Sequence, residues 1–149
     1  SWKKGRGILG PLGPLLGRWA AVGAAMPDGS VGDCARDFTA FGAGFVRLDA
    51  AWDMGARGVY RELALFGKSD EGALAVWSFT IDGKRSTGII ADASDVHPDA
   101  VAFVAEMPAG TARSIYWPDE DGAEGFRFAV ESKVKKGWNR FLDHRYRPA

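Results

Sequence analysis

Residues 45–53, FVRLDAAWD, alternate between apolar and charged side chains. The apolar members would share one face of an extended chain, and they are Val46, Leu48, Ala50 and Trp52. Arg47, Asp49 and Asp53 fall on the opposite face. A period of two residues is typical of a β-strand with one face in a core and the other in water. The stretch therefore predicts a half-buried strand.

Similar short runs follow throughout the sequence, at 59–66, 74–81, 86–91, 101–107, 112–117, 126–132 and 138–146. Turn-forming residues divide them. Asp82-Gly83 stands where a two-residue hairpin turn would, longer turns are expected at 108–110 and 119–122, and Lys136-Gly137 separates the last two runs. Together with two runs before residue 45, this indicates about ten strands at a spacing of roughly 8–12 residues.

Such a meander of hairpins predicts an all-β fold, a single up-and-down antiparallel β-barrel of about 8–10 strands. Closing the sheet is favoured because it removes two exposed edges. Residues 1–14 are expected to form an N-terminal tail and residues 15–149 the barrel domain. A barrel of this size has room inside for one small ligand.

The composition excludes several classes of protein. Lys and Arg together number 19, as do Asp and Glu, so the net charge is zero. Nucleic-acid binders usually have a basic excess, and no nucleic-acid partner is expected here. The apolar run at 8–16 is too short and too interrupted by Pro and Gly to span a membrane. Cys34 is the single cysteine, which excludes an internal disulfide and favours a cytoplasmic protein.

Gly17-Arg18-Trp19 opens the first regular run. It resembles the Gly-x-Trp motif in the first strand of lipocalins and their relatives in the calycin superfamily. In that superfamily the tryptophan plugs the closed end of the barrel under an arginine from the last strand, a contact worth about 0.5–2 kcal/mol. The resemblance implies this role for Trp19, with Arg145 or Arg147 as the cation. The alternative is that Trp19 is an ordinary core residue.

The wider layout is similar to small bacterial lipocalin-like barrels of unknown function. The shared parts are a Gly-x-x-Arg-x-x-x-Trp strand, an Asp-Gly hairpin and a closing strand that ends in tyrosine and arginine. Here they are 110–117, Asp121-Gly122 and Tyr146-Arg147.

Nitrobindin-like haem proteins are a more distant resemblance, because they are also small barrels that open with a Gly-x-Trp strand. Their axial histidine lies in the closing strand, which implies His144 as the iron ligand and haem as the alternative cofactor. The family's ligand position falls nearer Phe141, which cannot bind iron.

Charged residues also share faces with aromatic ones. Arg113 shares a face with Trp117, and Glu62 shares another with Tyr60. If these faces point inward, they place charge in an aromatic-lined lumen, where it must be paired or bind a charged group. The alternatives for Arg113 are an outward orientation or an ion pair with Glu62 or Glu106.

These patterns predict binding of a small, mostly hydrophobic molecule, with Arg113 meeting an acidic group on it. The expected ligand-binding residues are Trp19, Trp52, Tyr60, Glu62, Phe79, Arg113, Trp117, Phe128, Trp138 and His144. No catalytic residue is assigned, although an enzyme could use Glu62 or Tyr146 as its titratable group. No metal site is expected, since the acidic residues around His97 match no known ligand spacing.

The remaining alternative is an interaction module whose barrel is filled by its own side chains, for which six tryptophans and nine phenylalanines would suffice. The chain is expected to be a monomer or a homodimer. The apolar outer positions of 73–79 are the candidate contact between two copies.

Overall fold

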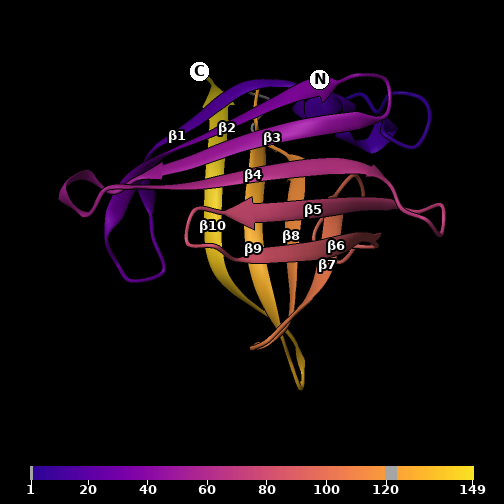
Figure 1. Cartoon of the computed structure of the whole chain (residues 1–149). Coiled ribbons are helices and arrows are strands. Elements are labelled where there is room, and N and C mark those ends of the chain that lie inside the picture. The colour runs from indigo at the N-terminus through magenta and orange to yellow at the C-terminus, as the bar shows by residue number, and fades with distance from the viewer. Residues whose placement is uncertain (1, 120–123) are drawn as a thin grey trace.

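The computed structural model describes residues 2–119 and 124–149 (Figure 1). Over these residues the chain forms two short 3-10 helices, η1 (Gly10–Leu15) and η2 (Gly55–Arg57), and ten strands. The strands are β1 (Gly17–Ala25), β2 (Val31–Phe41), β3 (Phe45–Asp53), β4 (Val59–Lys68), β5 (Leu74–Thr80), β6 (Arg85–Ala91), β7 (Val101–Met107), β8 (Gly110–Pro118), β9 (Phe126–Val134) and β10 (Gly137–Pro148).

The strands form one closed barrel. Each strand pairs antiparallel with the next along the chain, and β1 also pairs with β10. In Figure 1, β1–β4 cross the direction of β8–β10, so the sheet wraps around a common interior. Closure gives every strand two neighbours, which leaves no edge to aggregate. This confirms the predicted all-β fold, an up-and-down antiparallel barrel within the expected range of strand number.

Strand β3 shows why these residues form a barrel wall. Val46, Leu48 and Ala50 are buried in the interior. Arg47 and Asp49 alternate with them on the outer face and pair with each other, with 2.9 Å between Arg47 Nε and Asp49 Oδ2. The alternation in the sequence is therefore the inside and outside of the barrel.

Within the described residues most connections are short turns, as expected, and the exception is the nine-residue segment 92–100 between β6 and β7. The turn at Asp82-Gly83 is longer than the predicted two residues, because β5 ends at Thr80 and β6 begins at Arg85. Gly83 has φ 85°, in the left-handed region that glycine adopts at low cost, and its N–H donates to the carbonyl of Thr80. Residues 120–122 of the predicted turn at 119–122, including Asp121-Gly122, lie outside the described residues.

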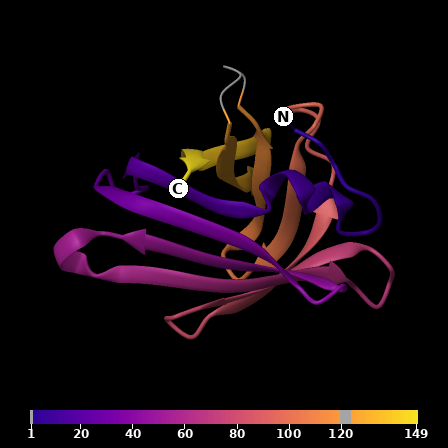
Figure 2. The ribbon, with the colours of Figure 1, turned by 90° about the horizontal axis from the view of Figure 1, so that it is seen from above.

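The N-terminal segment and β1 close one end of the barrel (Figure 2). Leu12 and Leu15 are fully buried in the main core, so part of the segment expected to be a tail packs into the barrel. Trp19 Nε1 donates to the carbonyl of Leu15 at 2.7 Å, and its ring meets the Phe126 ring edge-on at 5.2 Å between centroids. Trp19 thus packs between helix η1 and the start of β9.

The two arginines that the resemblance offered as partners of Trp19 both form ion pairs with Asp119. Arg145 Nε lies 3.0 Å from Asp119 Oδ2, and Arg147 Nη1 contacts the same oxygen. These pairs tie the last strand to the end of β8.

The helices within 2–119 and 124–149 have at most six residues, and none of them has the length and apolar character needed to cross a membrane.

Candidate functional site

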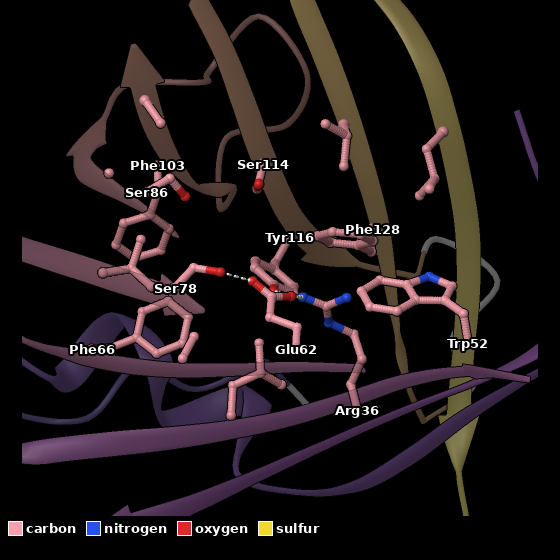
Figure 3. Close-up of a pocket in the computed structure, with 17 residues that line it drawn as sticks. Arg36, Trp52, Glu62, Phe66, Ser78, Ser86, Phe103, Ser114, Tyr116 and Phe128 are labelled. Carbon is pink, nitrogen blue, oxygen red and sulfur yellow. Dashed lines mark hydrogen bonds and ion pairs between the residues drawn. The ribbon is translucent and has the colours of Figure 1, made fainter. Parts of the chain in front are cut away.

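The barrel encloses a cavity of about 220 Å³. Strands β2 to β10 all contribute interior side chains to it (Figure 3). The aromatic side chains of Phe66, Phe103 and Tyr116 line it, together with the aliphatic side chains of Leu48, Val76 and Val130. A mostly apolar cavity with a few convergent polar groups is the usual form of a small-molecule site.

Arg36 supplies a positive charge to the cavity. It lies on β2, its side chain is only 3% exposed, and its guanidinium reaches the lumen. Nη2 donates to the hydroxyl of Tyr116 at 2.7 Å and lies 3.9 Å from Glu62 Oε1. The contact with Glu62 is too long for a hydrogen bond, so the carboxylate balances the charge of Arg36 without saturating its donors.

Aromatic rings surround the guanidinium. Its central carbon lies 4.0 Å from the centre of the Phe128 ring, 5.4 Å from that of Tyr116 and 5.9 Å from that of Trp52. A cation over an aromatic face is stabilised, and more strongly when water is excluded. The three rings therefore hold the cation in place within an apolar wall (Figure 3).

Several buried polar atoms near Arg36 have no hydrogen-bond partner. Among the described residues, these atoms include Arg36 Nε and Nη1, His144 Nδ1 and the Tyr146 hydroxyl oxygen. Buried polar groups are nearly always paired, so an unpaired cluster indicates a missing partner. Nitrogen donors on a fixed positive charge call for an anionic acceptor.

Arg36 and Tyr116 keep the protonation states that an anion needs. Burial raises the pKa of Tyr116 to about 12, although the nearby Arg36 acts in the opposite direction, so the phenol stays protonated at neutral pH. Burial opposes the charge on Arg36, but Tyr116, Tyr146 and Glu62 outweigh it and the pKa of Arg36 lies above its usual value. Arg36 is therefore a permanent cation beside a neutral hydroxyl.

The second carboxylate oxygen of Glu62, the one away from Arg36, has a partner of its own. The hydroxyl of Ser78, on β5, donates to Glu62 Oε2. Glu62 and Ser78 both line the cavity, one on each of two paired strands. The lumen thus contains one cation and one carboxylate, each with a neutral hydroxyl beside it.

Three of the predicted site residues line this cavity: Trp52, Glu62 and Phe128. Trp19 lies at the closed end. Tyr60 lies two residues before Glu62, near the start of β4. The centres of its ring and the Trp52 ring are 5.6 Å apart, and its hydroxyl donates to Asp82 at 3.1 Å.

The structure places Arg113, Trp117 and Trp138 outside the barrel wall, not in the lumen. Arg113 Nε donates to Glu131 at 2.8 Å, and its central carbon lies 4.3 Å from the centre of the Trp138 ring. Its Nη2 also bonds Asp95, in the segment that connects β6 and β7. Arg113 does form an ion pair, but with these partners and not with Glu62 or Glu106.

The physical reason is that the outer face of β8 is itself covered. Trp117 and Ile115 pack with Ala93 and Ala102 in a second apolar cluster, with Val96 against it. The inward face of β8 carries Ser114 and Tyr116 instead.

A bulge moves Trp138 to the outer face. The register between β9 and β10 shifts between Arg140 and Leu142. Before the shift, Trp138 and Arg140 face the outer cluster; after it, Leu142, His144 and Tyr146 face inward. Strict alternation over 138–146, which would place Trp138 on the same face as His144, is therefore broken at this bulge.

Phe79 is also not brought to the cavity. It alternates with the cavity-lining Ser78 on β5, so it points outward and is 47% exposed. Its outward position agrees with the alternative in which the apolar outer face of 73–79 meets another surface.

The residues present do not fit the haem alternative. His144 Nε2 lies 2.8 Å from the carbonyl oxygen of Ala25, and since a carbonyl only accepts, this nitrogen carries the hydrogen. His144 is buried but is not one of the residues that line the cavity, and Phe141 points outward. Burial lowers the pKa of His144, so its imidazole is neutral.

The sequence interpretation missed Arg36 and Tyr116. Arg36 shares the inward face of β2 with Cys34 and Phe38, both buried. The same two-residue alternation that identified β3 could have shown that an arginine stands between two apolar residues on one face.

No protein-family model matches the sequence, and no curated protein matches it either.

Proposed function

We propose that this protein binds a small, mostly apolar molecule with an acidic group inside the barrel. Arg36, not Arg113, meets the acid, and the Tyr116 hydroxyl donates to it. The observation that carries the proposal is the buried guanidinium of Arg36, which lines the cavity and donates from Nη2 to the Tyr116 hydroxyl, while its Nε and Nη1 have no partner within hydrogen-bond distance.

The size of the cavity limits the ligand. About 220 Å³ is less than the roughly 300–1,000 Å³ of pockets for drug-sized molecules. A medium-chain or single-ring acid fits this volume better than a long lipid.

The affinity comes from two sources. Each methylene that leaves water for the aromatic and aliphatic lining contributes about 0.8 kcal/mol. The acid contributes orientation and selectivity, because a carboxylate accepts from Arg36 and Tyr116 in a site where water competes little. The cavity itself favours this function over a barrel filled by its own side chains.

Calorimetric titration with octanoate and 1-octanol tests the proposal, since the two share a chain and differ in the head group. We expect octanoate to bind at least about tenfold more tightly, the effect of one net hydrogen bond to a charged group. Equal affinities would contradict recognition of the acid. Absence of binding by both would contradict ligand binding.

A further inference from the structure

The side of the cavity away from Arg36 carries hydroxyl groups. Ser78 on β5, Ser86 on β6 and Ser114 on β8 all line the cavity. Ser78 and Ser86 are directly paired across their strands. Figure 3 shows Ser86 and Ser114 at the side of the cavity that is distant from the guanidinium. The cavity therefore has a second polar region in addition to the one around Arg36.

Two of these hydroxyls are without partners. Ser78 donates to Glu62, but within the described part of the chain the side chains of Ser86 and Ser114 make no hydrogen bond. Both residues are half-buried and line the cavity, so a ligand hydroxyl there can take the place of water as their hydrogen-bond partner. Alanine at both positions would suit a plain hydrocarbon tail better, because the tail would then displace no water from a hydroxyl.

The residues between these hydroxyls are small. Gly88 and Ala105 are paired across β6 and β7, and both line the cavity. A Cβ at Gly88 would lie 3.0 Å from Val76 Cγ1 and 3.3 Å from Phe103 Cβ, so a larger residue there would press on the wall. This side of the cavity is kept open, which leaves Ser86 and Ser114 accessible to a ligand.

We propose that the ligand carries a second hydrogen-bonding group distant from its acid, so that the site takes a small hydroxy acid in preference to a plain acid of the same length. This inference rests on the proposed function, since Arg36 and Tyr116 hold the acid end. The ligand hydroxyl bonds Ser86 or Ser114, depending on the length of the ligand, because Ser114 is level with Ile90, four residues beyond Ser86 along β6.

Selectivity follows from the unpaired serines. A site built to hydrogen-bond a ligand hydroxyl discriminates against the analogue that lacks it, because that analogue displaces water from the serines without replacing its hydrogen bonds. The preference is a property of the serine side of the cavity, whereas the requirement for an acid is a property of Arg36. The two are separable by mutation.

The test is calorimetric titration of the full chain with butanoate, hexanoate and octanoate and with their ω-hydroxy counterparts. At least one hydroxy acid is expected to bind about tenfold more tightly than the plain acid of equal length, the effect of one hydrogen bond. The Ser86→Ala, Ser114→Ala double variant removes only two oxygens and should abolish this preference. Thr87→Val, which removes an exposed hydroxyl on the same strand, should keep it.

Two results would overturn the inference while the proposed function stands. In one, the plain acids bind as tightly as their hydroxy counterparts. In the other, the preference for a hydroxy acid survives in the double serine variant. If none of the acids binds, plain or hydroxylated, the proposed function fails and this inference fails with it.

Discussion

Replacing Arg36 by methionine should separate recognition of the acid from binding of the apolar chain. Methionine has nearly the length of the arginine stem and fills irregular apolar space well. The variant therefore keeps most of the contacts with Trp52 and Phe128 and removes the positive charge. It also leaves Glu62 as the charged group of the lumen nearest the ligand.

The size of the effect follows from the burial of the group. Arg36 is 3% exposed, so its bond to a carboxylate forms almost without competition from water. Truncating one partner of a buried, hydrogen-bonded charge pair costs about 2–5 kcal/mol. At about 1.4 kcal/mol per tenfold, octanoate should bind from about 30-fold to several thousandfold more weakly. The affinity for 1-octanol should change by less than about threefold, because its chain contacts stay.

Calorimetry at neutral pH measures both affinities, with Arg47→Met as the control. Arg47 lies on the outer face of β3 and pairs with Asp49, so its loss should leave both affinities unchanged. If the Arg36 variant does not fold, Tyr116→Phe tests the same point, and we expect it to weaken octanoate about tenfold through one lost hydrogen bond. Retention of wild-type octanoate affinity without Arg36 would refute the reasoning.

Three further predictions concern the frame around the site. Leu12→Ala should lower the free energy of unfolding in urea by about 2–5 kcal/mol, because Leu12 is fully buried. A decrease of less than about 1 kcal/mol would mean that η1 is not part of the barrel core. Burial lowers the pKa of His144 from 6.5, so the unfolded chain binds more protons than the folded chain. The free energy of unfolding should therefore decrease as the pH is lowered below about 6.5, by at most about 1.4 kcal/mol per pH unit. His144→Gln should remove this component when urea unfolding is compared at two pH values, and an unchanged pH dependence would count against it. Glu131→Gln should destabilise the fold by about 1.5–3 kcal/mol, because it weakens the hydrogen bonds to Arg113 and Arg140. The affinity for octanoate should not change, and a changed affinity would show that the outer cluster is coupled to the cavity.

The barrel could be predicted from the sequence because its signal is local. Apolar and charged residues alternate over 45–53 because one face of β3 is buried in the barrel and the other is on the outside. Turn residues then give the strand order without any long-range information, since each strand pairs with its neighbour along the chain.

The contents of the lumen were harder to predict, because alternation shows which residues share a face but not which face is inside. On β8 both faces are apolar, since the segment between β6 and β7 covers the outer one, so Arg113 and Trp117 have the pattern of a lumen face. On β10 a bulge reverses the alternation after Arg140, and nothing in the local sequence marks it. Arg36 was within reach of sequence reasoning, but its partners Tyr116 and Glu62 come from strands far away in the chain.

The most direct test of the central claim is a carbon-13 NMR titration of octanoate labelled at its carboxyl carbon and bound to the protein. A carboxylate beside a buried guanidinium is stabilised in its charged form. The bound ligand should therefore show a pKa below that of free octanoate and stay ionised as the pH falls. A pKa raised above that of free octanoate would place the acid in apolar surroundings away from Arg36, and would contradict the proposed site.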